Sequence, residues 1–273
     1  MRRIPHYKSY DRGPLEFGSK VHREEGEIMT IARKRVISTT PTQPIKSAVK
    51  LMTDNRIRRL PIIRPGTEKL EGMLRSRDII DFLGGGQKHD IVLYKFGGNF
   101  YAAINEPVRT IMSRNFPTGD VHMSITEAAR FLLRVGVGGI PILDRQGNIR
   151  GIISERDFIN YVPASTGSLV SYYMVRRVIT AGPKLSIREA AQRMVSWGVR
   201  RLPVVEGGEL VGIVTTVDLL RYFGTSKVFQ HMRSQRMDEA LSVPVEEIMT
   251  REVLKVTPET DVGEAASLMR EEK

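Results

Sequence analysis

Apolar residues recur along the chain in two alternating spacings. Ile187, Ala190, Ala191 and Met194 follow the three- and four-residue spacing of an amphipathic helix. Shorter apolar runs that contain a proline, such as residues 202–205, are typical of strands. Because helical and strand patterns alternate over most of the chain, the sequence predicts an α/β fold.

The same order of elements returns along the chain. Each copy opens with a methionine-containing turn, and a short segment then leads to an amphipathic helix. In three copies a proline-containing strand, a tight turn, a return strand and a second helix follow. The pattern therefore predicts a unit with the order strand–helix–strand–strand–helix. The methionine turns are Ile28-Met29-Thr30, Ile111-Met112-Ser113, Tyr173-Met174-Val175 and Ile248-Met249-Thr250.

One unit alone cannot cover its own apolar surfaces. An isolated copy would leave one sheet face and two helix faces exposed to water. We therefore expect consecutive copies to pair and to bury these faces against each other.

This order of elements resembles that of CBS (cystathionine β-synthase) repeats, in the archaeal-type multi-repeat form. The resemblance is carried by the Arg-Arg-Leu-Pro-Val strand at 200–204 and by the return strand Gly-Ile-Val-Thr-Thr-Val-Asp at 212–218. It covers nearly everything from residue 28 onward. It implies tandem repeats that pair into Bateman modules, and two such modules usually stack into a flat disc.

The resemblance divides the chain into two modules. Repeat 4 stops near the end of its first helix, so we expect either a longer natural protein or a partner that covers it. The expected ranges are 28–161 for the first pair (repeat 1 at 28–83, an insertion at 84–106 and repeat 2 at 107–161) and 170–273 for the second pair (repeat 3 at 170–224 and the truncated repeat 4 at 244–273).

Two segments fall outside the repeats. Residues 1–27 are polar and charged, and we interpret them as a tail or capping arm, with a basic nucleic-acid-binding arm as the alternative. The insertion opens with Gly84-Gly85-Gly86, a composition that also occurs in phosphate cradles. No Lys-Ser or Lys-Thr pair follows in P-loop fashion, so the sequence favours a plain linker.

Two helix starts carry a hydroxyl and a carboxylate three residues apart, Ser154 with Asp157 and Thr215 with Asp218. A helix N-terminus offers unpaired N–H groups to phosphate oxygens, and the Asp can accept from both hydroxyls of a ribose. The same spacing is also a helix-capping pattern that needs no ligand. The CBS resemblance favours ligand binding, because family members use this hydroxyl for phosphate or ribose and this Asp for the ribose diol.

The resemblance also implies a place for an adenine base, between the first strand and the proline-containing strand. Family members hold the base there with backbone groups and apolar side chains. The alternative is that the apolar residues and prolines are only core and turn residues. The implied positions are Thr118, Gly139, Ile140 and Pro141 in repeat 2, and Thr180, Arg201, Leu202 and Pro203 in repeat 3.

The copies differ at these positions. Repeat 1 keeps Asp78 but has Arg75 in place of the hydroxyl, so Ser38, Arg59 and Asp78 form a weaker candidate site. Arg75 would either supply charge to a neighbouring phosphate or fill the pocket. Repeat 4 lacks the Asp-bearing part. We therefore rank the site of repeat 2 first, that of repeat 3 next and that of repeat 1 last.

Several arginines are candidates for phosphate charge. Repeat 2 has Gly138-Gly139 where the other two repeats have an arginine pair, which opens room beside its strand. Plain solvation at the surface is the alternative role for such side chains. The candidates are Arg58, Arg59, Arg156 and Arg200.

Composition further limits the ligands, cofactors and locations that we expect. The formal net charge is +11, which suits phosphate ligands, or a nucleic-acid partner as the alternative. There is no Cys and the five His residues are isolated, so we expect neither a metal nor another cofactor. No apolar stretch reaches the roughly 18–20 residues of a membrane span, and we expect a cytoplasmic location.

These features together predict a sensor and not an enzyme. The ligand would be AMP, ADP, ATP or a related adenosyl compound bound between paired repeats, and an unknown effector protein would receive the signal. We also expect a homodimer formed through the CBS pairs. The alternatives are a nucleic-acid-binding regulator that uses the basic surface and a structural dimerisation module with empty pockets.

Overall fold

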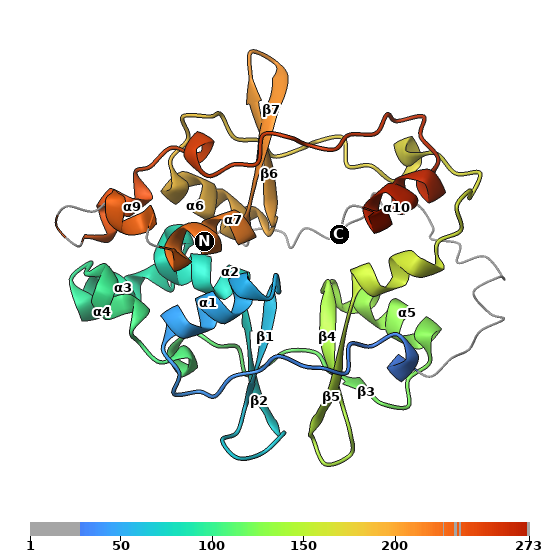
Figure 1. Ribbon diagram of the computed structural model, residues 1–273, viewed down its shortest axis with the longest axis horizontal. Coiled ribbons are helices and arrows are strands. Elements are labelled where there is room, and N and C mark those ends of the chain that lie inside the picture. Colours follow the sequence, from blue (N-terminus) through green and yellow to red (C-terminus); the bar gives the residue numbers. More distant parts are fainter. Residues whose placement is uncertain (1–27, 226, 232–233, 235, 272–273) are drawn as a thin grey trace, which may run out of the picture.

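The computed structural model describes residues 28–225, 227–231, 234 and 236–271 of the chain. Figure 1 shows four repeat units around a common centre, with repeats 1 and 2 in the lower half and repeats 3 and 4 in the upper half. The predicted tandem arrangement of α/β units is therefore confirmed. The arm predicted at 1–27 lies outside the described residues.

Each repeat is built from short elements. Repeat 1 contains α1 (Ile45–Asp54), β1 (Arg59–Ile63), β2 (Leu70–Arg75), α2 (Ser76–Ile80) and a π-helical turn, η3 (Asp81–Gly85). Repeat 2 contains β3 (Gly119–Asp120), α5 (Ile125–Val135), β4 (Gly139–Leu143), β5 (Ile149–Ser154) and the 3-10 helix η5 (Glu155–Tyr161). Repeat 3 contains α6 (Ile187–Trp197), β6 (Arg201–Glu206), β7 (Glu209–Thr215) and α7 (Thr216–Gly224), and repeat 4 contains α10 (Val262–Glu271). A short 3-10 turn lies at the start of each of the four repeats, at η2 (Ile28–Thr30), η4 (Val108–Thr110), η6 (Val170–Tyr172) and η7 (Val245–Glu247).

An antiparallel hairpin lies at the centre of repeats 1, 2 and 3, formed by β1–β2, β4–β5 and β6–β7. The first strand of the predicted unit is much shorter than the others. In repeat 2 it is β3, which pairs in parallel with β4. In repeats 1 and 3 it is reduced to single bridges, from Thr39 to Ile62 and from Ala181 to Val204. The predicted order of elements is confirmed for these three repeats.

The segments that lead into repeats 1 and 2 are exchanged between these partners. Residues 28–33 open repeat 1 but run beside β5 of repeat 2. There the Arg33 N–H donates to the Ile152 carbonyl at 2.9 Å, and the Ile152 N–H donates to the Arg33 carbonyl at 3.1 Å. In return, residues 107–113 open repeat 2 but pair with β2 of repeat 1. We call these stretches lead-in segments.

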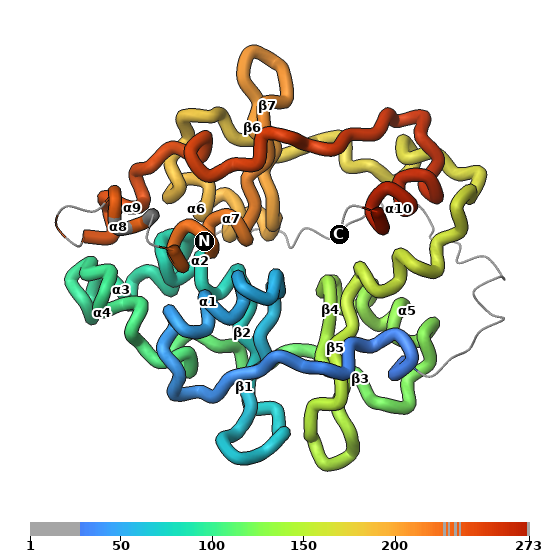
Figure 2. Tube along the Cα trace, in the orientation of Figure 1, coloured from blue at the N-terminus to red at the C-terminus, as the bar shows by residue number. Residues whose placement is uncertain are grey.

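The second pair shows one half of this exchange. The lead-in segment of repeat 4, residues 244–250, pairs with β7 of repeat 3 through Thr250 and Ile213, with N···O distances of 2.8 and 2.9 Å. Figure 2 shows both crossings, as the dark blue tube that passes β5 and the red tube that passes β6 and β7. Backbone hydrogen bonds therefore tie each described pair of repeats together.

The lead-in segments explain why the repeats share a methionine in the opening turn and a glycine in the return strand. A Cβ added to Gly72 would lie 2.7 Å from Met112 Sδ, and one added to Gly212 would lie 2.7 Å from Met249 Sδ. The methionine of the turn thus packs over the glycine of the partner's return strand. In the remaining case a Cβ added to Gly151 would lie 3.1 Å from Ala32 Cβ and 3.5 Å from Met29 Cε.

The helix faces of repeat 1 are covered by repeat 3 and not by the consecutive repeat 2. Helices α1 and α2 pack against α7, and η3 packs against α6. One apolar core runs through both repeats, with Ile45, Leu60 and Leu202 all fully buried in it. The expectation that consecutive copies bury each other's helix faces is therefore wrong for repeat 1, because consecutive copies meet mainly through hairpins and lead-in segments.

The insertion 84–106 is helical, which corrects the expectation of a plain linker. It contains α3 (His89–Phe96) and α4 (Phe100–Ile104). It lies beside α9 (Met237–Leu241) of the linker between repeats 3 and 4, which also contains α8 (Lys227–Gln230). The Met237 N–H donates to the Gly98 carbonyl at 3.0 Å. A Cβ on Gly85 would lie 2.8 Å from the Val195 side chain. Close packing against α6 therefore accounts for this glycine without a phosphate.

We expect Gly212→Ala to destabilise the second pair of repeats. The new methyl group would lie 2.7 Å from Met249 Sδ and 2.9 Å from the Thr250 carbonyl oxygen, so the lead-in segment must move. The expected loss is about 1–3 kcal/mol of unfolding free energy, measured by urea denaturation. Gly182→Ala is the control, because an added Cβ there meets nothing within 4 Å. Equal effects of the two substitutions would contradict this packing role.

Candidate functional site

The two predicted hydroxyl–carboxylate pairs fold back onto their own helix starts. In repeat 2 the Ser154 N–H and hydroxyl donate to Asp157 Oδ2, at 2.6 and 2.8 Å. In repeat 3 the Thr215 N–H and hydroxyl donate to Asp218 Oδ2, at 2.9 and 2.7 Å. Both pairs therefore form capping boxes at η5 and α7.

Capping occupies only one oxygen of each carboxylate. The second oxygen of Asp157 lies 3.6 Å from Arg33 Nε, and the second oxygen of Asp218 lies 3.2 Å from Arg221 Nη1. Both arginine side chains are largely exposed, at 61% and 59%. A carboxylate accepts about four hydrogen bonds. Oδ1 of each Asp is thus held by one exposed cation and retains acceptor capacity while Oδ2 caps the helix.

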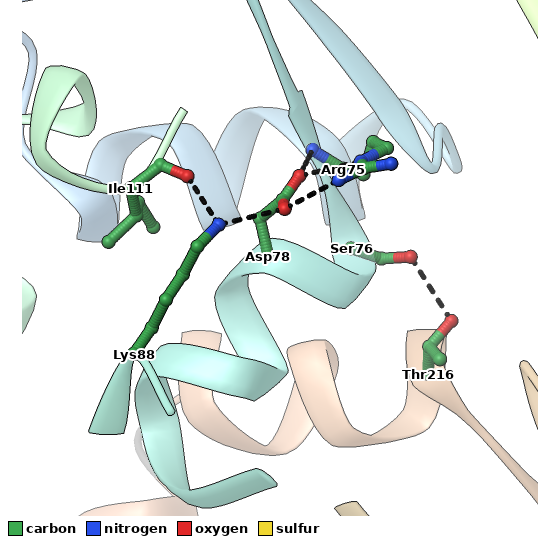
Figure 3. A network of polar contacts seen from close by, with 6 residues as sticks. All are labelled: Arg75, Ser76, Asp78, Lys88, Ile111 and Thr216. Carbon is green, nitrogen blue, oxygen red and sulfur yellow. Dashed lines mark hydrogen bonds and ion pairs between the residues drawn. The ribbon is translucent and has the colours of Figure 1, made fainter. Parts of the chain in front are cut away.

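Repeat 1 binds its corresponding Asp much more tightly. Figure 3 shows Asp78 between Arg75 and Lys88. Arg75 donates to Asp78 Oδ2 from its N–H and its Nε, at 2.9 and 2.8 Å, and to Oδ1 from Nη2 at 2.9 Å. Lys88 Nζ donates to Asp78 Oδ1 at 2.9 Å and to the Ile111 carbonyl at 2.8 Å. The Asp78 side chain is only 4% exposed, so protein groups fill its surroundings.

The negative charge of Asp78 is balanced by the positive charges of Arg75 and Lys88. Burial by itself raises the pKa of Asp78, but the hydrogen bonds and charges of Arg75 and Lys88 lower it below its ordinary value. The hydrogen bond to Asp78 raises the pKa of Arg75 in turn. Arg75 was expected either to supply charge to a neighbouring phosphate or to fill the pocket. In the structure it fills the site.

Strand register places the other predicted residues beside these helix starts. Gly139 lies opposite Ser154, Arg201 opposite Thr215, and Arg59 opposite Arg75. The residues predicted on the first strand come one position before the short parallel pairing to the proline-containing strand, and they are Ser38, Thr118 and Thr180. The structure therefore brings the predicted members of each site to one end of each hairpin.

Two predicted residues point their side chains into the core. Ile140 and Leu202 have no exposed surface, and they belong to the apolar clusters of repeats 2 and 3. Their side chains therefore take the core role that the sequence left as an alternative, and a base could meet only their backbone. Pro141 is buried as well, whereas Pro203 is partly exposed.

Arginines from three repeats lie close to one another. Burial lowers the pKa of Arg58, and the charges of Arg200, Arg201 and Arg156 lower it further. We call these four residues together with Arg59 the arginine cluster. Gly138 leaves room for it, because a Cβ there would lie 2.7 Å from Arg59 Nη2 and 2.8 Å from Arg200 Nη1.

The cluster carries positive charge that is only partly balanced. Burial, followed by the charges of Arg200 and Arg58, lowers the pKa of Arg59 to about 10, while the charge of Glu155 opposes this shift. Burial and the charge of Arg200 also lower the pKa of Arg201. Cations crowded in this way are stabilised by an anion, and phosphates suit the planar donors of arginine.

Sequence reasoning missed three contributors to these sites. Arg33 reaches Asp157 from the lead-in segment of repeat 1, and Lys88 reaches Asp78 from the insertion. Glu155 lies between Ser154 and Asp157 in the sequence, but nothing in the spacing of that pair indicates that it faces Arg200. No local pattern identifies these residues, because each acts on a repeat or segment distant in the sequence.

Within the part of the chain that the structure describes, no group of three or more His, Asp or Glu residues could hold a metal ion. No helix among the described residues is both long and apolar enough to cross a membrane.

Known proteins share the sequence pattern. The family model described as CBS domain matches residues 26–85, 108–164, 170–225 and 245–273. Protein MJ1225 of Methanocaldococcus jannaschii is 38% identical over 245 residues, which are 89% of this chain and 88% of that protein. A 33.4 kDa protein in a ribosomal RNA operon of Thermofilum pendens is 31% identical over 220 residues, which are 80% of this chain and 73% of that protein.

Solved structures share the fold. The crystal structure of protein MJ1225, which is described as a candidate archaeal homologue of g-AMPK, gives a TM-score of 0.85 at 37% identity over 89% of each chain. A crystal structure of a Pyrococcus horikoshii protein gives a TM-score of 0.53 at 22% identity, covering 90% of this chain and 88% of that chain. The second likeness shows a common fold alone.

We expect Asp78→Asn to destabilise the protein more than Asp157→Asn does. Both substitutions keep a capping oxygen, but the first leaves Arg75 and Lys88 without their anion, whereas the partner of Asp157 is one exposed arginine. The expected losses are about 2 kcal/mol for Asp78→Asn and under about 1 kcal/mol for Asp157→Asn, measured by urea denaturation at neutral pH.

The same network predicts a pH dependence. Because the pKa of Asp78 is lowered in the folded protein, its contribution is present above the ordinary carboxyl pKa and disappears as the pH falls through the folded value. The difference in stability between Asp78→Asn and the parent protein should therefore shrink on acidification. A difference that stays constant down to the acid transition would show that Asp78 acts only as a cap.

Proposed function

Because this chain belongs to the CBS domain family, we propose that it is a regulatory module that binds an adenine nucleotide (AMP, ADP, ATP or a related adenosyl compound) between its paired repeats. The observation that carries the proposal is the arginine cluster, which gathers positive charge from three repeats beside the helix starts of repeats 2 and 3. Its partly unbalanced charge is what a ligand phosphate would neutralise.

In the proposed complex, the parts of a nucleotide meet different groups. The ribose hydroxyls donate to the Oδ1 atoms of Asp157 and Asp218, whose Oδ2 atoms remain on their caps. The phosphates extend to the arginine cluster. The base lies against the backbone at one end of the hairpin, beside Gly139 in repeat 2 and Arg201 in repeat 3, with Thr118 and Thr180 at the ends of the short first strands.

We propose that the sites of repeats 2 and 3 bind the ligand and that the site of repeat 1 does not. Asp78 already accepts four hydrogen bonds from Arg75 and Lys88, so a ribose would have to displace two cations from a carboxylate that is 4% exposed. Asp157 faces a single exposed arginine at 3.6 Å, which a ribose displaces at little cost.

Regulation follows if the ligand favours one arrangement of the repeats. A nucleotide at the cluster touches arginines of repeats 1, 2 and 3 at once, so its affinity depends on how these repeats sit together. Only such a difference in affinity can shift a conformational equilibrium. The description of protein MJ1225 as a candidate homologue of g-AMPK supports a role in sensing AMP or ATP. The effector protein, the homodimer and the cytoplasmic location remain parts of this proposal.

We expect Asp157→Ala to weaken nucleotide binding at the site of repeat 2 by about tenfold or more, because two hydrogen bonds from the ribose to a carboxylate are lost. Loss of the cap should cost about 1 kcal/mol of ligand-free stability. Titration calorimetry with AMP, ADP and ATP measures the first effect. Asp78→Ala is the matched control and should leave the number of bound nucleotides unchanged. The proposal fails if the parent protein binds none of the three at millimolar concentration.

We expect Arg59→Met to raise ligand-free stability while it weakens binding of phosphorylated ligands. The lowered pKa of Arg59 means that its charge opposes folding at neutral pH. Removing the charge should therefore add about 1 kcal/mol at pH 7. Thermal unfolding and ATP titration measure the two effects. The exposed Arg64→Met serves as the control and should change neither.

A further inference from the structure

Glu155 lies between Ser154 and Asp157 in the sequence, and its side chain faces the arginine cluster. Its N–H donates to the Gly138 carbonyl at 3.2 Å, which fixes its backbone beside the cluster. Its Oε2 lies 3.3 Å from Arg200 Nη2. The Glu155 side chain is 49% exposed and that of Arg200 is 38% exposed, so water and solutes reach the contact.

Three repeats supply charged atoms to one point in space. A Cβ added to Gly138 would lie 2.9 Å from Glu155 Oε2, close to the distances already given for Arg59 and Arg200. A carboxylate of repeat 2 and guanidinium groups of repeats 1 and 3 therefore surround the same small volume. Gly138 keeps this volume free of a side chain.

The charge of Glu155 reaches beyond its contact with Arg200. Burial and neighbouring arginines lower the pKa values of Arg58, Arg59 and Arg201, and the charge of Glu155 raises all three. A single carboxylate thus partly balances several guanidinium groups. A ligand phosphate that approached these groups would meet the negative charge of Glu155 at the same place.

We propose that Glu155 is a resident counter-anion of the arginine cluster, which stabilises the cluster in the ligand-free protein and competes with the phosphates of a bound ligand. This inference rests on the proposed binding of phosphorylated ligands at the cluster. Glu155 then sets a minimum negative charge for an effective ligand, because only a group with more negative charge than one carboxylate displaces it effectively. The site should consequently discriminate between ligands by phosphate number.

The test is the variant Glu155→Gln, which keeps the shape of the side chain and removes its charge. We expect affinity for ATP and for inorganic tripolyphosphate to rise about tenfold, affinity for AMP to rise less, and affinity for uncharged adenosine to stay unchanged. The melting temperature of the ligand-free variant should fall, because the arginines lose their counter-anion, and added tripolyphosphate should restore it. Titration calorimetry and thermal unfolding at a fixed ionic strength measure these effects.

Two controls separate this role from a general effect of charge. Glu209→Gln changes the net charge equally at an exposed position on β7, and it should alter neither affinity nor melting temperature. Glu155→Asp retains the charge on a shorter side chain and should behave more like the parent protein than Glu155→Gln does. Equal gains in tripolyphosphate affinity for Glu155→Gln and Glu209→Gln would overturn the inference, as would no gain for either.

Nucleotide binding by the parent protein distinguishes a failure of the counter-anion role from a failure of the proposed function. If tripolyphosphate binds more tightly to Glu155→Gln while the parent protein binds no adenosine compound, the counter-anion role is supported and the proposed nucleotide ligand is wrong. If nucleotides bind the parent protein and Glu155→Gln leaves their affinities unchanged, the proposed function stands and the counter-anion role is wrong.

Discussion

The exchange of lead-in segments is the constraint on which the arrangement of this protein depends. A return strand has one edge on its hairpin and one open edge, and the lead-in segment of the neighbouring repeat occupies the open edge of β2, β5 and β7. Paired repeats therefore cannot separate without losing backbone hydrogen bonds. The exchange also carries Arg33 to Asp157 and the Ile111 carbonyl to Lys88, so it shapes the candidate sites as well as the fold.

Charge is distributed unequally among the repeats. In repeat 1 a buried carboxylate is matched by two cations, and the network is closed. In the arginine cluster, five arginines share little opposite charge besides Glu155 among the described residues, and the pKa of Arg59 falls to about 10. Such crowding opposes folding in the absence of a ligand and favours binding of an anion. The protein therefore gives up stability at the place where the proposed ligand binds.

Capping and ligand binding are compatible at the same Asp. The sequence presents them as alternatives, yet Oδ2 of Asp157 and Asp218 caps the helix while Oδ1 of each meets only one exposed arginine. The cap fixes the carboxylate in one orientation before any ligand arrives, which reduces the entropy lost on binding. Repeat 1 differs in the groups that contact the second carboxylate oxygen, because both Lys88 and Arg75 donate to Oδ1 of Asp78.

The sequence alone predicts the elements whose hydrogen bonds are local. The repeats, the hairpins, the pairing of Ser154 with Asp157 and the candidate role of Arg58 and Arg200 all follow from spacing within about thirty residues and from the repetition of the pattern. It could not determine which repeat covers which, because all four copies present similar apolar faces. The packing of α2 on α7, the contact of Lys88 with Asp78 and the contact of Glu155 with Arg200 become visible only in the folded chain. These contacts join residues that are distant along the chain, and a repeated local pattern carries no information about such partners.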